Sequence, residues 1–173
     1  NFPADVLAQT LTLPPTPDQP LLPGLKIKLP GTASSGLPVF YSVLSGPGIV
    51  SSDSLAINAV GTIIIRAEQP GNDEYSAATS KRDTIIITKG NQLISFDSIP
   101  DKLFHSQRVF QLSGASNSGL PVFFTLISGN AGIGGNNITL TGAGTVVIEA
   151  RQLGNSSYNA ATPVQRSFCV GVD

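Results

Sequence analysis

Hydrophobic and polar residues alternate over many short stretches of this chain, and such alternation predicts β-strands. Clear examples are residues 25–29, Leu-Lys-Ile-Lys-Leu, and residues 61–67, Gly-Thr-Ile-Ile-Ile-Arg-Ala. In the first stretch we expect both lysines to face water. In the second we expect Ile63, Ile65 and Ala67 to face the core while Arg66 is solvated, and we expect the same of Glu149 in the similar stretch of residues 144–150. Helical periodicity is not evident anywhere in the sequence. The sequence therefore predicts an all-β fold.

The pattern of the first half returns in the second half at a constant offset of 83 positions, without a gap. Ser-Gly-Leu-Pro-Val-Phe at residues 35–40 recurs at residues 118–123. The shorter matches at the same offset begin with Ser45-Gly46, Gly61-Thr62, Gly71-Asn72, Tyr75 and Ala77-Ala78-Thr79. A fixed period with matched turn residues indicates one structural unit used twice. We therefore expect a tail or linker over residues 1–8, a first repeat over 9–89 and a second repeat over 90–173.

Each repeat carries about seven short strands with frequent turn signals, which is typical of an immunoglobulin-like β-sandwich. The Cys–Trp–Cys core of antibody domains is missing, because the chain has one cysteine and no tryptophan. Residues 14–23 hold five prolines, so we expect them at a sheet edge or in a loop. Residues 45–53 are rich in glycine and turn-forming residues and are interpreted as turns. The short link over residues 89–92 predicts a stiff joint between the repeats.

Composition narrows the range of partners. The chain is 40% hydrophobic and 12% charged with a net charge of −1, which argues against disorder. There is no basic stripe to neutralise phosphates, so nucleic acid is not an expected partner. No apolar run approaches the roughly 18 residues of a membrane span, so membrane insertion is not expected. The chain begins at Asn1 without a signal peptide, and we interpret it as part of a longer or processed protein.

The sequence offers little chemistry for catalysis or for a cofactor. His105 is the only histidine, and Cys169 is interpreted as a small buried strand residue, not as a nucleophile. No Ser/His/Asp arrangement can be read, so we expect no enzyme activity and no cofactor. Zinc would need several Cys, His or carboxylate ligands. Asp73 and Glu74 could contribute to a calcium site, but serines replace both in the second repeat, so no metal site is predicted.

Tyr75 and Tyr158 occupy matching loops and are interpreted as structural pins of those loops. A tyrosine that precedes the final strand can bury its ring and donate its hydroxyl proton to the backbone. Ligand stacking is the alternative interpretation, and the sequence favours the structural role.

Phe40 and Phe123 are expected to point away from the core, beside Ser42 and Thr125 respectively. An exposed aromatic ring with hydroxyl neighbours is the kind of surface that binds sugars, so these four residues form a candidate ligand face. The alternative is that the proline-rich edge segment or the adjoining repeat covers each ring. We favour the alternative, and the exposure of the two rings decides between them.

The spaced motifs Ser-Gly-Leu-Pro-Val-Phe, Gly-Thr-(apolar)3-x-Ala and Gly-Asn-x-x-Tyr-x-Ala-Ala-Thr resemble those of MBG-type and related bacterial immunoglobulin-like repeats. The resemblance covers residues 9 to about 170. It implies tandem modules of secreted and cell-surface proteins, notably of Bacteroidetes, whose partners include neighbouring domains of the same polypeptide. The function expected on this basis is a non-catalytic extracellular stalk, spacer or adhesion module. A carbohydrate- or protein-binding module is the first alternative, and an accessory domain of a secreted polysaccharide-active enzyme is the second.

Overall fold

The computed structural model describes residues 6–172, and every regular element in them is a β-strand. The chain divides into two compact units between Gly90 and Asn91, one residue from the predicted boundary. Unit 1 contains β1 (Leu11–Thr12), β2 (Gln19–Pro20), β3 (Lys26–Lys28), β4 (Thr32–Ala33), β5 (Phe40–Ser45), β6 (Gly48–Ser51), β7 (Ser54–Ile57), β8 (Gly61–Glu68) and β9 (Lys81–Thr88). Unit 2 contains β10 (Ile94–Phe96), β11 (Lys102–Leu103), β12 (Val109–Gln111), β13 (Gly114–Ser116), β14 (Phe123–Ser128), β15 (Ala131–Gly134), β16 (Asn137–Leu140), β17 (Gly144–Arg151) and β18 (Val164–Gly171). No helix capable of crossing a membrane occurs in the described part of the chain.

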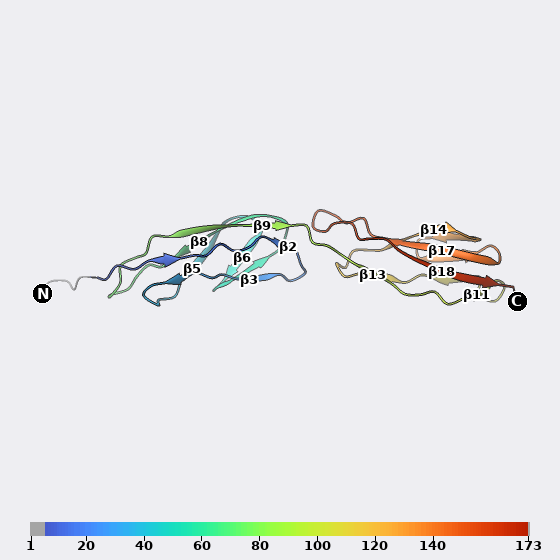
Figure 1. Ribbon diagram of the computed structural model, residues 1–173, viewed down its shortest axis with the longest axis horizontal. Helices are drawn as coiled ribbons and strands as arrows, with labels where there is room; N and C mark the ends of the chain where they lie inside the picture. Colours follow the sequence, from blue (N-terminus) through green and yellow to red (C-terminus); the bar gives the residue numbers. More distant parts are fainter. Residues whose placement is uncertain (1–5, 173) are drawn as a thin grey trace. The chain divides into compact units, whose positions relative to one another are not determined.

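Unit 1 is a β-sandwich of immunoglobulin type. A four-stranded sheet in the order β2-β9-β8-β5 faces a three-stranded sheet in the order β3-β7-β6, and β1 pairs with β4 (Figure 1). Alternation along β8 places Ile63 and Ile65 fully inside, where they meet Ile85 of β9 and Leu55 of β7. The predicted inward face of β8 is therefore confirmed, and the core lies between the two sheets.

Unit 2 repeats this arrangement with its own core. The orders are β11-β18-β17-β14 and β12-β16-β15, with β10 paired to β13. The register is also repeated, since Tyr41 pairs with Ala67 in unit 1 and Phe124 pairs with Ala150 in unit 2. Each unit buries its own apolar cluster, so each is a complete sandwich.

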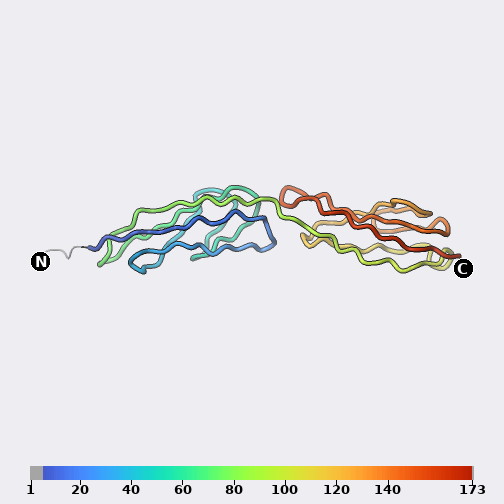
Figure 2. Tube along the Cα trace, in the orientation of Figure 1, coloured from blue at the N-terminus to red at the C-terminus, as the bar shows by residue number. Residues whose placement is uncertain are grey.

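The proline-rich segment of unit 1 lies at a sheet edge, as predicted. Its strand β2 runs parallel to β9, and Figure 2 lets the reader follow the two segments side by side, blue beside green. The carboxylate of Asp18 accepts a hydrogen bond of 2.8 Å from the backbone N–H of Ile86 in β9. Asp101 accepts the same bond from Cys169 in unit 2, so both units use one edge arrangement despite their different sequences there.

Three local expectations are wrong. Residues 45–53 are not only turns, because Gly48–Ser51 forms β6 and pairs with β7 as a hairpin. Glu149 is not solvated like Arg66, its counterpart in unit 1, because Arg151 and Gln165 cover its carboxylate. Cys169 lies on a strand but is exposed, because Phe168 and Val170 take the inward positions beside it.

Part of the predicted upstream tail belongs to unit 1. Residues 1–5 lie outside the described residues. Leu7 donates a backbone hydrogen bond of 2.8 Å to the carbonyl of Glu74 and accepts one of 2.9 Å from Ser76. These bonds attach the segment before β1 to the loop that carries Tyr75.

Candidate ligand-binding surface

The repeated Ser-Gly-Leu-Pro-Val-Phe motif takes part in a buried hydrogen-bond network. In unit 1 the side-chain amide of Gln9 donates to the side-chain carbonyl of Gln69 at 2.8 Å. The hydroxyl of Ser35 donates to Gln9 at 2.6 Å, and Gln69 donates to the carbonyl of Pro38 at 3.3 Å. Both glutamines are buried, and a buried amide is costly unless its hydrogen bonds are made. The start of the motif is therefore structural.

Unit 2 contains the same network. Gln92 donates to Gln152 at 2.7 Å, Ser118 donates to Gln92, and Gln152 donates to the carbonyl of Pro121 at 3.2 Å. The glutamines also match at the offset of 83. Sequence reasoning missed them because single polar residues beside strands are not expected in a core. Their repetition was the signal that could have found them.

The loops of Tyr75 and Tyr158 are held through asparagine and backbone groups. The side-chain oxygen of Asn72 accepts hydrogen bonds from the backbone N–H groups of Glu74 and Tyr75, at 2.9 and 2.8 Å. The N–H of Asn72 in turn donates to the carbonyl of Tyr75 at 2.9 Å. Asn155 forms the matching bonds around Tyr158.

Both tyrosine rings are half-buried. Within residues 6–172 we find no hydrogen bond of either tyrosine hydroxyl. Asn72 and Asn155 thus form side-chain hydrogen bonds inside these loops, and the buried glutamines form others to them. The tyrosines contribute backbone groups and half-buried rings.

Phe40 and Phe123 are exposed, each at 56%. Phe40 begins β5 and Phe123 begins β14, and each strand is the outer edge of its four-stranded sheet. The expected cover by the proline-rich segment of unit 1 is wrong, because that segment pairs with β9 at the opposite edge of the sheet. Ser42 and Thr125 are also exposed, two residues further along the same faces. The structure thus brings together each predicted pair of ligand-face residues.

In unit 1 Phe40 is a lining residue of two open hollows. One has a volume of about 810 Å³ and lies where β5 meets the β3–β4 connection and the β6–β7 turn, with Lys28, Tyr41 and Asp53 among its lining residues. The other has about 430 Å³ and includes Arg66, Glu68 and Ser80. Phe40 therefore stands between two recesses with polar walls.

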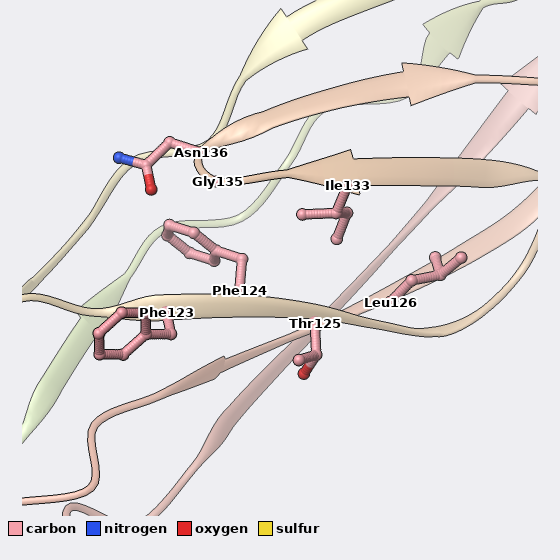
Figure 3. Close-up of a pocket in the computed structure, with 7 residues that line it drawn as sticks. All are labelled: Phe123, Phe124, Thr125, Leu126, Ile133, Gly135 and Asn136. Atoms are coloured by element: carbon pink, nitrogen blue, oxygen red, sulfur yellow. The ribbon is translucent and has the colours of Figure 1, made fainter.

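In unit 2 the corresponding hollow beside Phe123 has a volume of about 450 Å³. Figure 3 shows Phe123 and Thr125 on one side of β14, while Phe124 lies on the other side toward Ile133 of β15. Five of its seven lining residues lie 83 positions after lining residues of the larger unit 1 hollow, so both hollows occupy the same place in the fold.

The charges differ between the two units. In unit 1, Lys28 and Asp53 form an ion pair of 3.6 Å at one hollow, and Arg66 pairs with Glu68 at the other. Unit 2 has Gln111 and Asn136 in place of the first pair. It keeps the second pair in reversed order, as Glu149 and Arg151.

The two acidic side chains beside the phenylalanines differ in accessibility. That of Glu149 is 8% exposed, against 45% for Glu68. Hydrogen bonds from Gln165 and Arg151 hold the pKa of Glu149 below its usual range. In unit 2 the carboxylate is therefore occupied by neighbours, while in unit 1 it is open to a ligand.

Tyr41 lines the larger hollow of unit 1. Its hydroxyl accepts a hydrogen bond of 2.7 Å from the N–H of Gly31 and donates one of 3.3 Å to the carbonyl of Leu29. Partial burial raises the pKa of the Tyr41 hydroxyl. Phe124 replaces Tyr41 in unit 2 and packs on Phe96, with ring centroids 5.1 Å apart, so the wall there is apolar. Sequence reasoning did not single out Tyr41.

The two residues considered for catalysis, His105 and Cys169, lie on different elements of unit 2. His105 lies in the turn after β11 with its ring against Phe104, while Cys169 lies on the outer face of β18. Over residues 6–172 no group of three or more His, Cys, Asp or Glu side chains is placed to hold a metal ion.

Comparison with known proteins gives likeness of fold only. No protein-family model matches the chain, and no curated protein matches its sequence. Among solved structures it is similar to Drosophila N-cadherin EC1-4, with 13% identity, a TM-score of 0.36, and coverage of 94% of this chain and 50% of that one. It is similar to human mucin-like protocadherin EC1-2, with 9% identity, a TM-score of 0.39, and coverage of 94% and 98%. The D00-D0 domain of intimin shows 16% identity, a TM-score of 0.32, and coverage of 92% and 98%.

The chain thus spans about half the length of the N-cadherin fragment that it matches. Its own topology defines the class, which is a tandem pair of immunoglobulin-like β-sandwiches.

Proposed function

We propose that this chain is a pair of non-catalytic structural repeats that serve as a stalk or spacer in a larger extracellular, cell-surface or secreted protein. In the same proposal the units are bacterial immunoglobulin-like repeats of MBG type. Their direct partners are then the neighbouring domains of the same polypeptide.

The repeated strand register is the observation that carries this proposal. Ile63 pairs with Ile85 in unit 1, and Val146 pairs with Phe168 in unit 2. The buried glutamine network is repeated as well. The second unit repeats the core, the strand register and the internal polar network of the first, while its surface charges differ. Repetition of structural features of this kind extends a protein and supports a spacer function.

The stiffness of the link tests the spacer function. Two residues, Lys89 and Gly90, lie between the end of β9 and the first residue of unit 2. Spin labels would be attached to the native Cys169 and to a Ser51→Cys variant, since both positions are exposed. We expect a single narrow distance distribution by pulsed electron paramagnetic resonance.

The control carries a Gly/Ser insertion between Lys89 and Gly90, which should broaden the distribution because such linkers are flexible. A wild-type distribution as broad as that of the insertion variant would contradict the spacer function.

A second candidate function is a carbohydrate- or protein-binding module. The exposure of Phe40 and Phe123 at matching positions favours it, because exposed apolar surface is unfavourable in water and marks sites of interaction. A glycan-array screen of the whole chain separates the two candidates, since a pure spacer gives no specific binding.

A further inference from the structure

We propose that unit 1, and not unit 2, binds a short neutral oligosaccharide across the ring of Phe40. This inference rests on the second candidate function and assigns it a position, a ligand class and a difference between the repeats. The surface concerned, called here the Phe40 trough, consists of Phe40 with Lys28, Asp53, Arg66 and Glu68.

The position follows from the two hollows that share Phe40. Phe40 lines both a recess of about 810 Å³ and one of about 430 Å³, and it is 56% exposed. A pyranose ring laid on the phenyl face would direct its substituents into both recesses. Sugar rings present C–H groups on their faces and hydroxyls at their edges, which suits an aromatic platform with polar groups on either side.

The ligand class follows from the charges. Each recess contains one ion pair, Lys28 with Asp53 and Arg66 with Glu68, so the trough has no net charge. All four side chains are at least 39% exposed, which leaves donors and acceptors free for hydroxyl groups. Hydrogen bonds to charged groups are stronger than those between neutral groups. Because each pair holds one positive and one negative group, the trough offers no net attraction to an anionic or cationic ligand, and a neutral hydroxyl-rich ligand fits best.

The difference between the repeats follows from residue replacements at fixed positions. Gln111 and Asn136 replace Lys28 and Asp53, and Phe124 replaces Tyr41. Glu149 replaces Arg66, and its carboxylate is covered by Arg151 and Gln165. Phe123 thus keeps the aromatic platform, but the exposed groups beside it are the neutral Gln111 and Asn136 and the cation Arg151, with no accessible carboxylate. Unit 2 is a control within the same molecule.

The test uses the whole chain and named probes. Soluble oligomers of glucose, xylose, mannose and galactose, with a sialylated oligosaccharide as the charged comparison, would be titrated into isotope-labelled protein and followed by NMR. We expect at least one neutral oligomer to shift the amide signals of β5 and β8 and to leave those of β14 and β17 unchanged. Phe40→Ala should weaken this binding by about tenfold or more, equivalent to about 1.4 kcal/mol.

Two matched variants make the test specific. Phe123→Ala removes an equally exposed ring from unit 2, which does not bind the ligand in this proposal. The affinity should therefore stay within about twofold of the wild-type value. Lys28→Gln with Asp53→Asn gives unit 1 the residues of unit 2 and should weaken binding while the fold is retained, because both side chains are exposed.

Three results would overturn the proposal. They are binding of the sialylated probe alone, equal losses in the two alanine variants, and no binding of any probe. The spin-label distance distribution does not depend on any of them, so the spacer function is judged separately.

Discussion

The side-chain amide of Gln9 lies 2.8 Å from the side-chain carbonyl of Gln69, and 83 positions later Gln92 and Gln152 form the same bond at 2.7 Å. In both units the pair joins the segment before the first strand to the residue directly after a long central strand, β8 in unit 1 and β17 in unit 2. The second glutamine of each pair also donates to the carbonyl of the proline in the repeated motif. A small buried hydrogen-bond network thus connects three separate segments in each unit.

We expect Gln69→Leu to lower the free energy of unfolding of unit 1 by about 1–3 kcal/mol, because the buried amide of Gln9 loses one of its two acceptors and keeps only the carbonyl of Ser76. Urea unfolding of the whole chain measures this. Ser42→Ala, on the exposed face of β5, is the control and should stay within about 0.5 kcal/mol. If Gln69→Leu unfolds at the urea concentration of the wild type, the network does not stabilise the unit.

Gly46→Ala tests the close approach of two strands. Gly46 has a φ of 99° beside the bulge in β5, and a Cβ there would overlap the carbonyl of Thr62. The strain of the left-handed region costs on the order of 1–3 kcal/mol for a residue other than glycine. We expect the overlap to make Gly46→Ala still more destabilising.

Gly36→Ala is the matched control for that substitution. Gly36 has a φ of 78°, but a Cβ there would meet nothing within 4 Å. It should therefore show the backbone strain alone. Equal losses of thermal stability in the two variants would show that the approach to Thr62 is unimportant.

The repeat pattern predicted the sandwich, its two units and the inward faces of the long strands. It succeeded because a buried face needs a period of two, which leaves a clear signature in residues such as Ile63, Ile65, Val146 and Ile148. It failed where exposure depends on side chains that come from other strands. The burial of Glu149 depends on Gln165 of the neighbouring strand β18, and the alternation along β17 contains no sign of it.

The candidate site was only partly readable for the same reason. Phe40 and Ser42 could be placed on an outer face from alternation alone. One of the ion pairs beside them joins two different elements, Lys28 of β3 and Asp53 of the β6–β7 turn, and alternation along a single strand does not reveal it. Tyr41 appeared to be an ordinary core residue, because its hydrogen bond to Gly31 depends on how β5 meets the β3–β4 connection.

Asn72→Ala is expected to destabilise unit 1 more than Tyr75→Phe. The first change removes the acceptor for two backbone N–H groups, each bond contributing about 0.5–1.5 kcal/mol. The second removes a hydroxyl that has no hydrogen bond to a described residue, and its effect should stay within about 0.5 kcal/mol. Thermal unfolding of the two variants measures the difference. The reverse order would mean that the tyrosine hydroxyl is the anchor of this loop.

Unit 2 should lose stability in acid through Glu149. Hydrogen bonds from Gln165 and then from Arg151 lower the pKa of Glu149 in the folded state, and its partial burial opposes them only in part. A carboxyl whose pKa is lower in the folded state stabilises the fold above its unfolded pKa of about 4.3, and this stabilisation is lost as the pH falls through the folded pKa.

NMR titration of the Glu149 carboxyl carbon tests that cause directly. The Gln165→Ala variant removes the first donor, so the pKa of Glu149 should rise toward the ordinary glutamate value, and the acid-induced loss of unit 2 stability should shrink. Ser167→Ala, at an exposed position two residues along β18, is the matched control and should leave the titration unchanged. An identical Glu149 titration in wild type and Gln165→Ala would show that the hydrogen bond from Gln165 does not lower the pKa of Glu149. Arg151 would then be the donor to test next.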